Sequence, residues 1–191
     1  MRLSNIELKA MNNAARRLLQ RTVEYPLFRR IGLTEQKCDI LEIGCGSGYG
    51  AVLLSELRPK SYVGIDLMPE QIALARERRL PNAEFMVHDA AYLPFADESK
   101  DTAVIFGVLH HIPMWRKVVS QVHRVLRPGG RFFVEEPDGA VVAKFDRVFA
   151  WGHAPDALFL LSDFERFLQA SGFTLLRQRY MLGFGWYHVR K

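Results

Sequence analysis

The spacing of hydrophobic positions changes from helical to strand-like near residue 38. From Ser4 to about Gln20, apolar side chains recur every three or four positions, which predicts an amphipathic helix. Pro26 and Gly32 bound a second, shorter predicted helix. Beyond this point, short runs rich in Ile, Val and Phe alternate with helical segments, a pattern typical of a mostly parallel sheet covered by helices.

Seven apolar runs have the length and composition of strands. They are Asp39–Ile43, Tyr62–Ile65, Glu84–Val87, Thr102–Phe106, Arg131–Glu135, Thr174–Arg179 and Tyr187–Arg190. Helices are predicted between the first five, at about Tyr49–Leu57, Pro69–Arg79 and Met114–Leu126. Ser162 and Glu165 have the spacing of a capping box, which predicts a helix that ends before Gly172. The last two strands are expected to pair antiparallel at the sheet edge.

The first predicted strand runs into a turn that contains Gly44, Gly46, Gly48 and Gly50. Such a turn lets a ligand approach the bare backbone, although any tight strand-to-helix turn can also use glycines. A dinucleotide fingerprint would need its third glycine at position 49, which is Tyr49. The turn also lacks the Gly-Lys-Ser or Gly-Lys-Thr of a P-loop. Phosphate binding is therefore a poor explanation for these glycines.

Two acidic residues follow the next two predicted strands. Asp66 ends the second strand, where a carboxylate can accept hydrogen bonds from ribose hydroxyls or can cap the next helix. Asp89 and Ala90 follow the third strand, where a carboxylate and a backbone N–H can recognise a base edge. Together with the glycine turn, they indicate a ligand that contains a nucleoside.

These segments give the chain a resemblance to a known family. The matching stretches are Leu41–Gly48, Val63–Asp66, Asp89–Phe95, Val108–Ile112 and Val125–Gly130. They resemble the class I S-adenosylmethionine-dependent methyltransferases, and in particular the methyltransferase type 11 and quinone-biosynthesis-like small-molecule enzymes. The resemblance implies an α/β fold with a Rossmann-like, doubly wound, seven-stranded sheet. The implied strand order is 3-2-1-4-5-7-6, with strand seven antiparallel, plus N-terminal helices.

The resemblance also implies which residues hold S-adenosylmethionine and its product S-adenosylhomocysteine. They are Glu42, Gly44, Cys45, Gly46, Gly48, Asp66, Leu67, Asp89, Ala90 and Phe106. In this assignment the glycines lie against the methionine end and Glu42 supports its ammonium group. Asp66 binds the ribose, Leu67 packs on the adenine, and Asp89 with the Ala90 N–H binds the adenine edge. Phe106 offers its backbone to the methionyl amine.

One domain is expected for residues 1–191, with an N-terminal helical cap at 1–37, a cofactor-binding half at 38–137 and a substrate-side half at 138–191. The acceptor pocket is expected between the cap and the stretch Pro137–Phe159. The aromatic residues of that stretch are Phe145, Phe149, Trp151 and Phe159, and they either clamp an apolar acceptor or belong to helix cores. Arg147 and His153 are further residues there without an assigned role.

His110 and His111 are the candidate catalytic residues, because both follow the fourth strand at the crevice where ligands bind in open α/β sheets. Imidazole has a suitable pKa for a general base. The alternative is a structural pair that caps or packs under the next helix, and neither histidine has an evident carboxylate partner in the sequence. The two cysteines, Cys38 and Cys45, fit neither a disulfide framework nor a zinc motif, and no metal site is expected.

Composition and charge limit the classes of protein and of binding partner that fit the chain. Hydrophobic residues make up 49% of the chain and charged residues 25%, which fits a globular protein. Absence of a long apolar run predicts no membrane span and a cytoplasmic protein, monomeric or homodimeric. Residues 1–40 hold eight Lys or Arg and four Asp or Glu, hence 8 − 4 = +4 of the net charge of +5. These charges either form a solvated helix face or contact nucleic acid, anionic lipid or an acidic substrate.

A small-molecule acceptor is therefore the leading hypothesis for the methyl group. An RNA or protein methyltransferase that uses the basic N-terminus and the Arg76, Arg78 and Arg79 cluster is the alternative, with nucleic acid possible but not favoured. A non-catalytic S-adenosylmethionine-binding protein is a third hypothesis.

Overall fold

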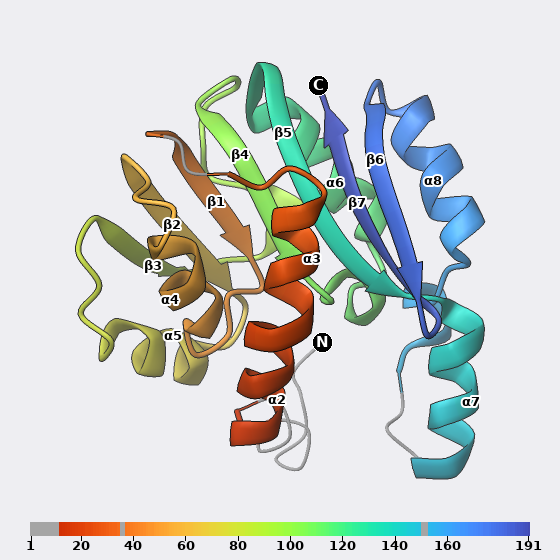
Figure 1. Cartoon of the computed structure of the whole chain (residues 1–191). Helices are drawn as coiled ribbons and strands as arrows, with labels where there is room; N and C mark the ends of the chain where they lie inside the picture. The colour runs from red at the N-terminus through yellow and green to blue at the C-terminus, as the bar shows by residue number, and fades with distance from the viewer. Residues whose placement is uncertain (1–11, 35–36, 150–152) are drawn as a thin grey trace.

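A seven-stranded sheet organises the described part of the chain, which is residues 12–34, 37–149 and 153–191 of a computed structural model (Figure 1). The strands are β1 (Asp39–Ile43), β2 (Ser61–Asp66), β3 (Ala83–Val87), β4 (Lys100–Phe106), β5 (Leu126–Pro137), β6 (Thr174–Met181) and β7 (Phe184–Arg190). Their order in the sheet is β3-β2-β1-β4-β5-β7-β6. The predicted strand order is confirmed.

Strand directions follow from the pairing registers. β1 lies between two parallel neighbours, because Leu41 pairs with Val63 of β2 and with Ala103 of β4. β7 instead runs antiparallel to both β5 and β6. The chain leaves β1 toward β2 and β3 on one side and returns to β4 and β5 on the other. The carboxyl ends of β1 and β4 therefore flank the topological switch point, where open α/β sheets bind ligands.

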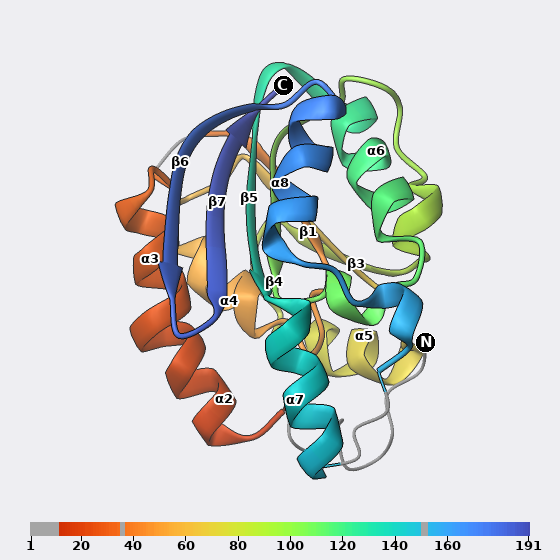
Figure 2. The same cartoon turned by 90° about the vertical axis from the view of Figure 1, so that its right-hand side faces the viewer.

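Helices cover both faces of the sheet (Figure 2). On one face lie α3 (Tyr25–Arg30), α4 (Tyr49–Ser55) and α5 (Pro69–Arg76), and on the other α6 (Trp115–Val125) and α8 (Leu161–Ala170). The alternation of side chains along a strand serves both layers, since Leu41 and Ile43 pack with α6 and α8 while Ile40 packs with α3 and α4. Within the described residues, no helix has the length and apolar character that crossing a membrane requires.

The N-terminal cap is one continuous helical path rather than two separate helices. Its α2 segment (Ala14–Leu19) passes through a π-helical turn, η1 (Gln20–Glu24), directly into α3. The Tyr25 N–H donates to the Gln20 carbonyl, and this wider turn lets Pro26 enter the first turn of α3 without a break. The predicted short helix between Pro26 and Gly32 is confirmed as α3, but no break separates it from α2. The expected helical residues Ser4–Met11 lie outside the described residues.

The cap of α8 also differs from its prediction. Ser162 lies inside the helix, and the N-cap position is Leu160, whose side chain makes no capping bond. A carboxylate distant in sequence replaces the capping box: Asp138 Oδ2 accepts from the Leu161 N–H at 3.1 Å. Its other oxygen, Oδ1, accepts from the Ala140 N–H at 2.9 Å in the first turn of α7 (Gly139–Phe149). Asp138 therefore satisfies the first turns of two helices.

We expect Asp138→Ala to lower the free energy of unfolding by about 2 kcal/mol, because both helices lose an N-terminal acceptor worth about 1 kcal/mol. Urea denaturation measures the change. Asp163→Ala is the matched control, because this carboxylate in the first turn of α8 pairs with Arg166 at the surface and should change the unfolding free energy by less than about 0.5 kcal/mol. Equal losses in the two variants would contradict the double cap.

Candidate functional site

The glycine turn after β1 brings bare backbone to the switch point. Gly44 and Gly46 both adopt positive φ, +69° and +51°. A Cβ on Gly44 would lie 2.5 Å from the Val108 side chain, so the turn and the loop after β4 are in contact there. A Cβ on Gly46 would meet no atom of the described residues within 4 Å. Gly44 therefore permits packing, whereas Gly46 leaves open space in the wall of the site.

Asp66 ties the glycine turn to the end of β2. Its Oδ2 accepts from the Gly46 N–H at 3.0 Å and its Oδ1 accepts from the Met68 N–H at 2.9 Å. Burial raises the pKa of Asp66, and the bonds from the backbone N–H groups act in the opposite direction. Since each carboxylate oxygen has two lone pairs, Asp66 retains acceptor capacity for hydroxyl groups of a ligand.

Asp89 and Ala90 form the corresponding corner after β3. Asp89 is the N-cap of a 3₁₀ turn, η2 (Ala90–Tyr92), and its Oδ1 accepts from the Ala91 N–H at 2.8 Å. The Ala90 N–H belongs to the first residue of this turn, where a helix leaves its N–H groups without helical partners. Both residues line the same cavity as Gly46 and Asp66.

The cavity has a volume of about 270 Å³ and mostly apolar walls, close to the lower end of roughly 300–1,000 Å³ for small-molecule sites. Six predicted cofactor residues contribute to it, namely Gly44, Gly46, Asp66, Leu67, Asp89 and Ala90. The other walls come from Ile43, Ile65, Met68, Gln71, His88, Gly107, Val108, His111, Ile112, Pro113 and Met114. It lies at the carboxyl ends of β1 to β4, the position expected from the topology.

Four predicted cofactor residues lie beside the cavity rather than in its walls. Glu42 is 2% exposed and its Oε2 accepts from the Tyr62 hydroxyl at 2.6 Å. Cys45 is buried, with a pKa raised chiefly by desolvation. Gly48 begins α4, and Phe106 packs its ring against Phe28 at a centroid distance of 5.0 Å. Their assigned cofactor contacts stay predictions.

The two candidate catalytic histidines have different surroundings, although both lie on the 3₁₀ turn η3 (Leu109–His111). His110 Nδ1 lies 2.8 Å from Glu136 Oε2, so the expectation that neither histidine has a carboxylate partner was wrong for His110. His111 lines the cavity instead. Desolvation, helped by the nearby His110 and His153, lowers the pKa of His111 to about 2. His111 is therefore neutral at physiological pH, and a catalytic role for either histidine stays a prediction.

Glu136 organises the loop that carries both histidines. It is fully buried, and its Oε1 accepts from the N–H groups of Val108 and Leu109 at 2.9 and 2.7 Å. Its Oε2 accepts from the His110 N–H at 3.2 Å as well as facing the imidazole. Sequence reasoning missed this residue. The signal was present, because Glu135 and Glu136 end a strand just as Asp66 does.

Of the residues predicted to line the acceptor pocket, the structure describes only some. Phe159 is 6% exposed and packs on Trp115 at a centroid distance of 4.5 Å, so it belongs to the core and not to a clamp. Phe145 is 50% exposed on α7, and Arg147 is exposed on the same helix. The Phe149 side chain and Trp151 lie outside the described residues. Met68, Gln71 and Met114, which the sequence analysis did not single out, line the cavity instead.

Comparison with protein families and curated proteins gives concordant matches. Residues 41–134 match the model of a methyltransferase domain. A Mycobacterium tuberculosis protein named phthiotriol/phenolphthiotriol dimycocerosates methyltransferase is 45% identical over 95 residues, which are 49% of this chain and 35% of that protein. A probable S-adenosylmethionine-dependent methyltransferase of Mycolicibacterium smegmatis is 39% identical over 100 residues, 52% of this chain and 38% of that protein. The matched segments thus span little more than a third of these relatives.

Solved structures match over most of the chain. A SAM-dependent methyltransferase from Aquifex aeolicus has a TM-score of 0.78 and 19% identity, covering 98% of this chain and 99% of that one. A SAM-dependent methyltransferase from Methanosarcina mazei has a TM-score of 0.69 and 26% identity, covering 87% and 97%. The similarity to the Aquifex protein extends the shared fold well beyond residues 41–134.

The buried Glu42 carboxyl predicts how the free energy of unfolding depends on pH. Burial raises the pKa of Glu42 to about 8, so the folded state keeps the proton that an unfolded glutamate loses near 4.5. Its contribution to stability is therefore complete below about 4.5 and is lost as the pH rises to 8. Relative to Glu42→Gln, which cannot ionise, the wild-type free energy of unfolding should fall by roughly 2–3 kcal/mol between pH 5 and pH 7.

Urea titrations of both proteins at pH 5, 6 and 7 measure this difference. A constant difference between wild type and Glu42→Gln would refute a protonated Glu42. Calorimetry of the same variant with S-adenosylhomocysteine tests the separate prediction that Glu42 supports the ammonium group, which requires loss of binding on removal of the carboxyl.

Proposed function

We propose, from the premise that the chain belongs to the family of S-adenosylmethionine-dependent methyltransferases, that it transfers the methyl group to an apolar small-molecule acceptor. One observation carries the proposal. The open backbone at Gly46 and the carboxylates of Asp66 and Asp89 meet in one cavity at the switch point of the sheet. These are the groups that a nucleoside with an attached amino acid needs.

The charges of the cavity fit the cationic methyl donor. Among the described residues that line it, the ionisable side chains are two aspartates and two histidines, with neither lysine nor arginine. Such walls attract a sulfonium and would repel the phosphates of a dinucleotide. We assign Asp66 to the ribose hydroxyls, and Asp89 with the Ala90 N–H to the adenine edge. Leu67 and Met68 supply the apolar surface on which the base packs.

When bound, S-adenosylmethionine supplies a methyl group on sulfur that a nucleophile displaces in line. The chain's part is to orient the reactants and to exclude water, for which little acid–base chemistry is compulsory. Val108, Ile112 and Met114 form an apolar wall of the cavity, and Val108 packs against Gly44. We assign this wall to the acceptor. Leu67 and Met114 are 46% and 44% exposed, which gives the cavity an apolar rim.

The contacts of three arginines, Arg16, Arg76 and Arg78, favour a small acceptor over RNA. Arg16 forms an ion pair of 2.6 Å with the buried Glu24, Arg76 donates to the Phe85 carbonyl, and Arg78 donates to the Ser47 carbonyl. These side chains hold the fold together and are restricted in reaching phosphates. The name of the Mycobacterium tuberculosis relative, which refers to phthiotriol and phenolphthiotriol dimycocerosates, also supports an apolar small molecule. A cytoplasmic location and a monomer or homodimer stay predictions.

Gly46→Ala should weaken S-adenosylhomocysteine binding at least tenfold in calorimetry, because its Cβ enters the open space that we assign to the cofactor. The backbone strain of a positive φ should lower the unfolding free energy by about 1–2 kcal/mol. Gly129→Ala is the control. Gly129 also has a positive φ, a Cβ there would meet nothing within 4 Å in the described part of the chain, and the residue lies outside the cavity walls. Equal affinity in the two variants would place the cofactor elsewhere.

Transfer itself is measured as S-adenosylhomocysteine formed with panels of apolar hydroxylated compounds, peptides and transfer RNA. We expect turnover in the first panel. Turnover with transfer RNA that falls steeply with salt would instead support the macromolecular acceptor. Cofactor binding without turnover in any panel would support a non-catalytic binding protein, and absence of binding would refute the proposal.

A further inference from the structure

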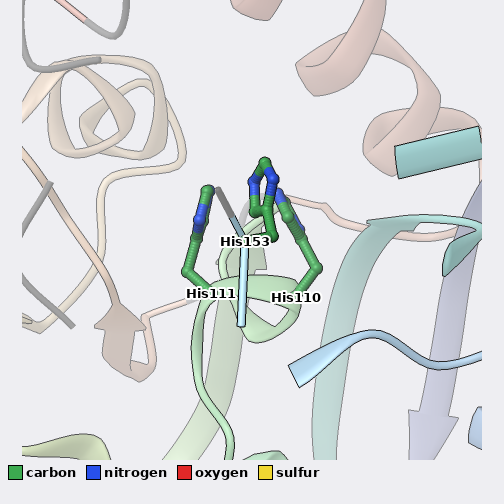
Figure 3. Close-up of side chains that lie close together, drawn as sticks. All are labelled: His110, His111 and His153. Carbon is green, nitrogen blue, oxygen red and sulfur yellow. The ribbon is translucent and has the colours of Figure 1, made fainter. Parts of the chain in front are cut away.

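Three histidines from two distant segments meet beside the cavity, and His111 is the one that lines it. His110 and His111 come from η3, and His153 comes from the segment before the 3₁₀ turn η4 (Pro155–Ala157). The His111 ring stacks on His153 at a centroid distance of 4.7 Å, and the His110 and His111 rings are 4.1 Å apart. Figure 3 shows the three rings grouped side by side. One ring nitrogen from each lies within 4.8 Å of the others.

Carboxylates hold two of these rings from behind. His110 Nδ1 faces Glu136 Oε2 at 2.8 Å, and His153 Nδ1 faces Asp146 Oδ1 at 2.7 Å. A bond from Nδ1–H to a carboxylate selects the tautomer whose Nε2 carries the lone pair, and this is the arrangement around metal-binding histidines in proteins. The two carboxylates also bring two negative charges, which a divalent cation would balance.

His111 adds an independent sign of a missing ligand. Its Nδ1 is buried and has no hydrogen-bond partner among the described residues. Buried polar atoms are normally satisfied, and an absent ion is one of the recognised explanations for an exception. Zinc–nitrogen bonds of about 2.0–2.1 Å place tetrahedral ligands roughly 3.3 Å apart, so modest side-chain rotations from the present spacing complete the geometry.

We propose that His110, His111 and His153 bind one divalent transition-metal ion of the zinc type, with its fourth coordination position open toward the cavity. Three imidazoles and an open position are the donor set of a catalytic zinc site rather than a structural one. His111 belongs both to this cluster and to the cavity wall, which places the ion beside the surface assigned to the acceptor.

The ion's role rests on the proposed function. A hydroxyl or thiol group of the acceptor binds at the open position, where the ion lowers its pKa. The proton passes to water, and the resulting anion attacks the methyl carbon as the carbon–sulfur bond breaks. Metal binding itself does not depend on this role and can be tested without an acceptor or a methyl donor.

The test uses the full chain without a polyhistidine tag, titrated with Co²⁺ and followed by visible absorption, and with Zn²⁺ followed by calorimetry. We expect one equivalent of each metal and the intense bands of four-coordinate Co²⁺. His153→Ala should weaken binding at least a hundredfold. Asp146→Asn, which changes only the group behind His153, should weaken it by about tenfold or more.

His123→Ala is the matched control, because its ring packs on Phe173 on the β5 side of the sheet and it should keep the wild-type affinity for metal. Circular dichroism checks that each variant folds. Absence of metal binding by the wild type, or equal binding by wild type and His153→Ala, overturns the site and leaves a purely structural histidine stack. S-Adenosylhomocysteine binding by the wild type is measured separately, and its failure would refute the proposed function instead.

Discussion

The buried carboxylate of Glu136 is the constraint on which the site depends. It ends β5 and accepts three backbone N–H groups and one imidazole from the loop after β4, so that loop has a single position. Val108 is thereby held against Gly44, where even a Cβ would clash. The wall assigned to the acceptor and the turn assigned to the cofactor are thus set relative to each other by one side chain. A buried carboxyl group without these hydrogen bonds would be strongly destabilising.

Much of the fold could be read from the sequence because its signals are local. The alternating strands, the glycine turn, Asp66 and Asp89 depend on short stretches, and the resemblance to a known family supplied the strand order. Long-range contacts account for what was missed. The Leu161 N–H at the start of α8 donates to Asp138 and not to a side chain of α8 itself. Phe159 packs into the core against Trp115. Neither partner is visible from spacing along the chain.

In the candidate site, too, the residues with local sequence signals were predicted and those that depend on long-range contacts were missed. Six of the predicted cofactor residues line the cavity because each ends a strand or lies in the loop directly after one, and the carboxyl ends of these strands meet by topology. The buried Glu42 side chain accepts a hydrogen bond from the Tyr62 hydroxyl, and the place of Glu42 in the sequence did not reveal this partner. His153 joins His110 and His111 because its segment, next to η4, lies against η3 in the fold. Sequence spacing alone gave no reason to associate His153 with that pair.

The placement of β7 has a consequence for the order of folding. This strand follows β6 in the chain but lies between β5 and β6, so β6 has no position in the sheet until β7 has been synthesised. β6 and β7 form their own antiparallel ladder across a short turn at Leu182 and Gly183, and such a ladder closes rapidly. The two strands are therefore suited to dock as one unit on β5. Until then, the edge of β5 stays open to pairing with other chains, which makes it a point of exposure for the nascent protein.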